Sequence, residues 1–313
     1  MMQISPEIQL FIREHSSDDV RVLALQAKKY PDIDMPTVIT QIAGRKVAAE
    51  KIPSWWEIEK IWYPKHLSLE QCSSEITARY KARLLQGDSL TDLTGGFGID
   101  CSFLATGFKS ATYVERQEEL CEIAAHNFPV LNLNHINIKN EDGVTYLQVM
   151  SPVDCLFLDP ARRNEHGGKT VAISDCEPNV AELEELLLQK ANRVMIKLSP
   201  MLDLSLALKE LKQTQEVHIL SVNNECKELL ILLGQTSPAE ISIHCVNLFT
   251  KGTQKEQHFV FTREQEQCSE CTYTDSLETY LYEPNASLLK AGAFRSIAAA
   301  YPVRKLHPNS HLY

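Results

Sequence analysis

A glycine-rich turn at residues 92–98 is the stretch of this 313-residue chain best suited to chemistry. It reads Asp92-Leu-Thr94-Gly95-Gly96-Phe97-Gly98, after a short apolar run and before a helix-like run at 99–106. Glycine permits the sharp bend, and the amides of a turn entering a helix can donate to an anionic ligand. The spacing departs from the dinucleotide fingerprint G-x-G-x-x-G, because Cys101 stands where the third glycine would be. A tight turn without a ligand is the alternative.

Glu115 is a second candidate for ligand binding. It ends a predicted strand at 111–114 and lies 23 residues after Asp92. A fixed carboxylate about 20 positions after such a turn can accept both hydrogens of a ribose diol. We therefore predict that Glu115 binds a ribose, with an ordinary cap of the helix expected at 117–127 as the alternative.

A third candidate is Asp159-Pro160-Ala161-Arg162, which follows the buried-strand pattern of residues 153–158. Doubly wound folds bind ligands at the carboxyl ends of their strands. Proline fixes φ and has no N–H, so it can hold Asp159 stiffly toward a substrate. The polar loop that follows could close on the substrate, with Arg162 or Arg163 holding a phosphate. His166 in that loop is either a general base or a solvated side chain.

The order of elements predicts how these candidates are positioned. Residues 1–86 show helical spacing of apolar residues, and residues 87–234 alternate strands and helices, which is typical of a parallel sheet covered by helices. Two apolar runs at 216–222 and 229–233 predict an antiparallel hairpin at the edge of a seven-stranded sheet. We predict an α/β protein of three parts: a helical domain, a Rossmann-like domain and a small C-terminal α+β region, which are residues 1–86, 87–234 and 235–313.

Residues 52–64 contain all three tryptophans of the chain. Aromatic residues at this density usually anchor a core or a domain junction, which is the interpretation we favour. Stacking on nucleic-acid bases is the functional alternative.

Charge and cysteine usage limit the class of protein. The net charge is −10, and residues 87–234 contribute all of that excess, with 12 basic and 22 acidic side chains. An acidic central region argues against broad non-specific binding of nucleic acid. Nine scattered cysteines indicate reduced thiols, and the single C-x-x-C at Cys268–Cys271 lacks the second pair of a zinc site, so we predict no metal site. Without a signal peptide or a long apolar run, we expect a cytoplasmic protein.

The combined motifs resemble a family. The turn at 92–98 resembles motif I of the class I S-adenosyl-L-methionine (SAM)-dependent methyltransferases, and Asp159–Arg162 resembles their motif IV in an Asp-Pro-Ala-Arg form. Together with Gln71–Lys81 and Glu283–Phe294, these motifs are similar to one bacterial group with an N-terminal helical domain and a C-terminal THUMP-like region. Much of such a THUMP-like region would lie beyond residue 313, so we expect the C-terminal region to be incomplete.

The resemblance implies roles for individual residues. SAM would be bound by Asp92, by Thr94 to Gly98 and by Glu115. Asp142 would meet the adenine amino group, with Gly143 as the turn after it, although Asp142 also suits a plain helix cap. In this family the helix before the first strand often contacts the methionine end of SAM, which makes Thr77 and Lys81 candidates, unless that helix serves packing alone.

The resemblance also implies a function. THUMP-type domains accompany RNA-modifying enzymes, so we predict a SAM-dependent methyltransferase acting on an RNA base, with Asp159, Pro160 and Arg162 on the acceptor side. Alanine in place of the second proline and arginine in place of an aromatic residue argue against N6-adenine chemistry. Cys176 is the nearest candidate for a cysteine nucleophile, although a buried thiol is the simpler interpretation. Methylation of a protein or small molecule, and a non-catalytic SAM- or nucleotide-binding module, are the alternatives.

Overall fold

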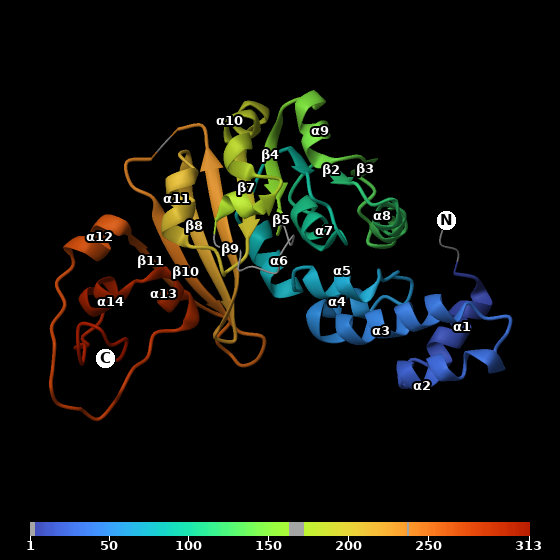
Figure 1. The fold of residues 1–313 in the computed structure, drawn as a ribbon, viewed down its shortest axis with the longest axis horizontal. Coiled ribbons are helices and arrows are strands. Elements are labelled where there is room, and N and C mark those ends of the chain that lie inside the picture. Colours follow the sequence, from blue (N-terminus) through green and yellow to red (C-terminus); the bar gives the residue numbers. More distant parts are fainter. Residues whose placement is uncertain (1–3, 163–171, 237) are drawn as a thin grey trace. The chain divides into compact units, whose positions relative to one another are not determined.

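The computed structural model describes residues 4–162, 172–236 and 238–313 (Figure 1). By their internal contacts these residues form two compact units, Met1–Val149 and Met150–Tyr313. The boundary between the units differs from the predicted boundaries at 86/87 and 234/235. The three-part division therefore stays a prediction, and the units are described in turn.

Short helices form the N-terminal part of the first unit. Ser5, Asp19 and Asp34 cap three of them by accepting hydrogen bonds from amides of the first turn. Apolar side chains of the first three α-helices pack into one cluster around Phe11, Val38 and Ile42. The helices are α1 Pro6–Glu14, α2 Val20–Leu25, η1 Ala27–Lys29, α3 Met35–Lys51, α4 Pro53–Trp56, α5 His66–Gln71 and α6 Glu75–Ala82.

The tryptophan-rich segment belongs to a second apolar cluster of the first unit. Trp55 is 2% exposed, and its ring meets the ring of Phe97 edge-on with centroids 5.2 Å apart. Trp62 stacks on His126 at 3.7 Å. Trp55 is therefore a core residue, as predicted, and it packs directly against the glycine turn.

Three parallel strands complete the first unit, in the order β1-β2-β3. Because the carboxyl ends of parallel strands meet at one edge of a sheet, this order brings the ends of β1 and β2 together. The strands are β1 Ser89–Asp92, β2 Ser110–Glu115 and β3 Ile136–Asn140, and the helices are α7 Ile99–Ala105, α8 Glu118–Val130 and α9 Gly143–Val149.

The second unit holds six strands of the large sheet in the order β4-β7-β9-β8-β10-β11. β4 pairs with β7, and β8 with β10, in parallel, whereas β9 and β11 run antiparallel to their partners. The strands are β4 Val153–Leu158, β7 Ala191–Leu198, β8 Thr214–Val222, β9 Glu225–Gly234, β10 Ser242–Leu248 and β11 Glu256–Thr262. A separate two-stranded ladder joins β5 Ala161–Arg162 to β6 Cys176–Glu177.

Helices accompany the strands of the second unit (Figure 1). α10 packs on β7, α13 packs on β8, β9 and β10, and α12 packs on β11 and α14. The helices are η2 Ile173–Asp175, α10 Val180–Lys190, α11 Leu204–Glu210, α12 Arg263–Cys268, α13 Ala286–Ala291 and α14 Phe294–Ala300.

The α/β class is confirmed, but the predicted strand count is wrong. The described residues hold nine strands of the large sheet, where seven were expected. The hairpin β8–β9 is internal, because β10 pairs along the outer side of β8 and β11 pairs with β10. An open β8 edge would leave a row of unpaired backbone groups, and β10 satisfies them. Within the described residues, no helix is long and apolar enough to cross a membrane.

Candidate active-site residues

Three glycines shape the turn between β1 and α7, and each meets a different constraint. A Cβ on Gly95 would lie 2.3 Å from the Tyr113 ring, so only glycine fits there. Gly96 and Gly98 have φ values of +54° and +86°, which glycine adopts without strain. The Tyr113 hydroxyl donates to the Gly96 carbonyl and fixes the turn from the neighbouring strand. The predicted turn is therefore held in one conformation from β2.

Glu115 meets this turn from the end of β2. Its Oε2 accepts a hydrogen bond of 2.8 Å from the Gly96 amide, and its Oε1 accepts one of 2.8 Å from the Gln117 amide. The side chain is buried, with 8% of the residue exposed. Glu115 thus links the glycine turn to β2 and also accepts a hydrogen bond at the start of α8. The second contact agrees with the helix-cap interpretation, and ribose binding by Glu115 stays a prediction.

Two other residues of the turn, Asp92 and Phe97, are buried. Asp92 is fully buried, and its Oδ1 accepts a 2.9 Å hydrogen bond from the Thr94 amide. Phe97 packs into the core with Trp55 and Tyr63, so only its backbone can serve a ligand. Asp92 therefore sets the entry to the turn, and Phe97 anchors the turn to the helical part of the unit.

Asp142 caps α9 in the structure. Its Oδ1 accepts hydrogen bonds from the amides of Val144 and Thr145 at 3.1 and 2.9 Å. Gly143 lies against the end of β1, since a Cβ there would be 2.1 Å from the Leu93 carbonyl oxygen. The cap interpretation of Asp142 thus fits the structure, and its contact with an adenine stays a prediction.

Lys81 belongs to a buried polar network at the start of α7. Its ammonium Nζ lies 2.8 Å from Asp100 Oδ1 and donates to Ser73 Oγ at 2.7 Å, and Ser73 Oγ donates to Asp100 Oδ2 at 2.7 Å. Lys81 itself is fully buried. Thr77, on the same helix, donates to the Ser74 carbonyl. These contacts give Lys81 and Thr77 structural partners, and their contact with a cofactor stays a prediction.

On the second unit, Asp159 and Pro160 follow β4 directly. Asp159 Oδ2 forms an ion pair with Lys197 Nζ of the neighbouring strand β7, and Pro160 is buried. Arg162 contributes its backbone to β5, where it pairs with Cys176. Cys176 is buried, as the simpler interpretation expected. Arg163 and His166 lie outside the described residues.

Sequence reasoning missed two partners of these candidates. Lys197 stands inside the apolar run Val194–Leu198, where it suggested only a strand residue. Asp100 follows the glycine turn on α7 and was not considered as a partner of Lys81. A charged residue within an otherwise buried pattern is the signal that could have identified both, since such residues are rarely buried without a partner.

Two solved structures named "putative methyltransferase" are similar to this chain. The protein of Porphyromonas gingivalis W83 is 35% identical, with a TM-score of 0.85 over 98% of this chain and 77% of its own. The protein of Streptococcus mutans, in complex with S-adenosylhomocysteine (SAH), is 14% identical, with a TM-score of 0.36 over 51% of this chain and 96% of its own. An rRNA methylase of Streptococcus thermophilus gives 14% identity and a TM-score of 0.36, over 51% and 93% of the two chains.

The first of these likenesses identifies the family, whereas the other two are too weak to support an argument. This chain belongs to the methyltransferase family of the Porphyromonas gingivalis protein. A family of ferredoxin-like domains matches residues 280–313, within the part of the chain predicted to be THUMP-like. The THUMP-like assignment stays a prediction. No curated protein matches the sequence.

Proposed function

We propose that this chain transfers a methyl group from SAM to an RNA base. Membership of the methyltransferase family supports the reaction class. The hydrogen bond between the Gly96 amide and Glu115 is the observation that supports the proposed cofactor site, because it brings the glycine turn and a buried carboxylate together where parallel strands end. The Asp-Pro-Ala-Arg motif and the resemblance to RNA-modifying enzymes support the choice of RNA.

The residues of the first unit suit SAM. Each oxygen of the Glu115 carboxylate accepts one backbone amide, and a carboxylate oxygen has a second lone pair that can accept a ribose hydroxyl. The glycine turn would let the cofactor approach the backbone closely, because Gly95, Gly96 and Gly98 have no side chains. Asp92, Thr94 to Gly98, Glu115, Asp142 and Gly143 would hold the cofactor, with Thr77 and Lys81 on the methionine side. SAM would supply an electrophilic methyl group.

The residues of the second unit would act on the acceptor. In this proposal Asp159 orients the acceptor or takes its proton, while Lys197 fixes the orientation of the Asp159 carboxylate through their ion pair. Pro160 stiffens the chain beside Asp159. Arg162 would hold a phosphate of the RNA by its forked guanidinium.

Binding and methyl transfer test the two halves of the proposal separately. Calorimetry with SAM and SAH should show binding to the wild type and to Asp159→Asn, and loss of binding in Asp92→Asn. Transfer of a radiolabelled methyl group to total cellular RNA should be lost in both variants. Asp88→Asn is a matched control, because Asp88 is exposed and its carboxylate forms a surface ion pair with Lys109. Binding that is equal in wild type and Asp92→Asn would contradict the cofactor assignment.

The acidic character of residues 87–234 favours a second candidate, methylation of a protein or a small molecule. An RNA enzyme should lose activity after ribonuclease treatment of the substrate and at raised salt, because phosphate contacts are screened. Label that persists in protein or small-molecule fractions would instead favour this second candidate. SAM binding without transfer to any fraction would indicate a binding module.

A further inference from the structure

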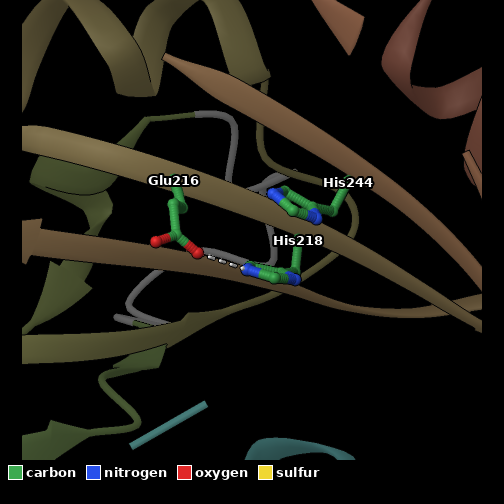
Figure 2. A group of neighbouring side chains, drawn as sticks. All are labelled: Glu216, His218 and His244. Atoms are coloured by element: carbon green, nitrogen blue, oxygen red, sulfur yellow. Dashed lines mark hydrogen bonds and ion pairs between the residues drawn. The ribbon is translucent and has the colours of Figure 1, made fainter. Parts of the chain in front are cut away.

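One carboxylate and two imidazoles meet on neighbouring strands of the second unit (Figure 2). Glu216 and His218 are two residues apart on β8 and share one face of the sheet. His244 on β10 is the register partner of His218, and the two rings stack with centroids 4.3 Å apart. One ligand atom from each residue lies within 4.8 Å of the other two.

The distances within this group suit the ligands of a small cation. Glu216 Oε2 and His218 Nε2 are 3.2 Å apart. Two ligand atoms of a tetrahedral zinc ion lie about 3.3 Å apart, given bonds of about 2.0–2.1 Å. The separation of this pair therefore matches that of two zinc ligands, and a bound cation would take the place of the proton that the two side chains share.

Neighbouring groups orient the carboxylate and one imidazole. Arg193 Nη2 on β7 donates to Glu216 Oε1 at 2.7 Å, which leaves Oε2 directed at the His218 imidazole. His244 Nε2 lies 3.1 Å from Ser242 Oγ. Metal ligands are commonly held by such outer contacts, which fix ring orientation and carboxylate geometry.

We propose that Glu216, His218 and His244 bind a divalent transition-metal ion of the zinc type and clip β8 to β10. Two imidazoles and a carboxylate suit Zn²⁺ and its first-row neighbours, and three protein ligands leave a fourth position for water. The sequence did not suggest this site, since 26 positions separate His218 from His244 and only the strand register brings them together. The competing explanation is a hydrogen-bonded ladder without an ion, which the positive charge of Arg193 near Glu216 favours.

Titration with Zn²⁺ alone distinguishes the two explanations. The full chain is used in a Cys268→Ser/Cys271→Ser background, because these two cysteines are the C-x-x-C pair of the sequence and could bind zinc themselves. After chelator treatment, calorimetry should show one saturable site. Glu216→Gln and His244→Ala should each weaken binding at least about 10-fold. His66→Ala is the matched control, since His66 lies 3.5 Å from Glu70 on an exposed helix, and it should change nothing.

A second measurement on the unaltered site guards against misfolded variants. Co²⁺ bound to the same background should give visible d–d bands without sulfur charge-transfer bands, and the melting temperature should rise with Zn²⁺ concentration. The absence of saturable binding, unchanged affinity in both variants, or thiolate bands in the serine background would overturn the proposal.

Discussion

The carboxylate of Glu115 accepts a hydrogen bond of 2.8 Å from the amide of Gly96, 19 residues earlier in the chain. This contact joins the end of β2 to the turn after β1 and places a buried carboxylate directly against the backbone of that turn. A hydrogen bond to a charged group is worth about 1.5–3 kcal/mol, so the contact both shapes the turn and fixes the carboxylate.

Replacement of Glu115 by glutamine tests whether cofactor binding needs the charge of this side chain, because glutamine has nearly the same shape. Glu115→Gln keeps an oxygen that can accept from Gly96 but removes the charge and one acceptor, so SAH binding should weaken by about 10-fold or more. Calorimetry measures the affinity, and the melting temperature should also fall, because glutamine has one oxygen to accept the two amides of Gly96 and Gln117. Glu118→Gln, three residues along on the exposed surface of α8, is the control and should bind like the wild type. Equal affinities in the two variants would remove Glu115 from the cofactor site.

Replacing glycines by alanine should destabilise the protein by amounts that depend on the surroundings of each glycine. Gly95→Ala forces a Cβ against the Tyr113 ring and should cost about 1–3 kcal/mol through overpacking. Gly98→Ala should cost about 1–2 kcal/mol for its left-handed backbone, plus the crowding of the Phe128 ring at 3.1 Å. Gly252→Ala isolates the backbone cost, because its φ is +89° and nothing lies within 4 Å of the added Cβ. Urea unfolding measures the free energy of unfolding of all three variants. If Gly98→Ala and Gly252→Ala lose the same free energy, the Phe128 ring moves aside at no cost.

The sequence predicted the local elements well, because their signals are local. Turn glycines, capping residues and apolar periodicity are read over a few positions, and the bounds of α7 and β4 agree with the runs predicted at 99–106 and 153–158 to within a residue. β10 and β11 lie within the C-terminal region that was predicted to be α+β. The sequence could not show that β10 pairs with β8, because strand pairing depends on which open edge is available in the folded sheet.

In the candidate site, too, local features were predicted and contacts between separate elements were not. The turn at 92–98 and Glu115 were expected to bind one ligand, and the structure joins them through the hydrogen bond from the Gly96 amide to Glu115. Pairs made by side chains from separate elements were missed, namely Lys197 with Asp159, Asp100 with Lys81, and His244 with His218. Each of these contacts follows from strand register or helix packing, which local periodicity does not encode.

The buried ion pair of Lys81 and Asp100 predicts a large loss of stability when one partner is removed. Lys81→Met removes the ammonium group that lies 2.8 Å from the buried Asp100 carboxylate, and should lower the free energy of unfolding by about 3–5 kcal/mol. The double variant Lys81→Met/Asp100→Asn should recover part of that loss, because no unpaired charge remains. Denaturant unfolding of the complete double-mutant cycle measures the coupling. A double variant less stable than Lys81→Met would contradict the ion-pair explanation.

Thiol reactivity should distinguish the cysteines by burial. Burial raises the pKa of Cys101 well above its ordinary value, raises that of Cys245 strongly, and raises that of Cys226 to about 11. Since the thiolate is the reactive form, these three should resist an alkylating reagent at neutral pH in the native protein. Cys268 is exposed and should react first. Mass spectrometry of peptides after brief labelling checks this order, and early labelling of Cys101 would contradict the described core.

The two depressed pKa values on β8 and β10 predict how stability depends on pH in metal-free protein. The pKa of His244 is about 4 when folded, against an ordinary 6.5, so the unfolded chain takes up this proton first as the pH falls. The pKa of Glu216 is about 2 when folded, against an ordinary 4.5. The stability that ionised Glu216 contributes is therefore fully present above pH 4.5 and is lost as the pH falls toward 2. The free energy of unfolding should therefore fall between pH 6.5 and 4 because of His244, and further below 4.5 because of Glu216. Urea unfolding across this range should show a shallower fall between pH 6.5 and 4 in His244→Ala, and an unchanged fall in His66→Ala. If the free energy of unfolding depends on pH in the same way in the wild type and His244→Ala, then His244 titrates like an exposed histidine. Its burial beside His218 would then not lower its pKa.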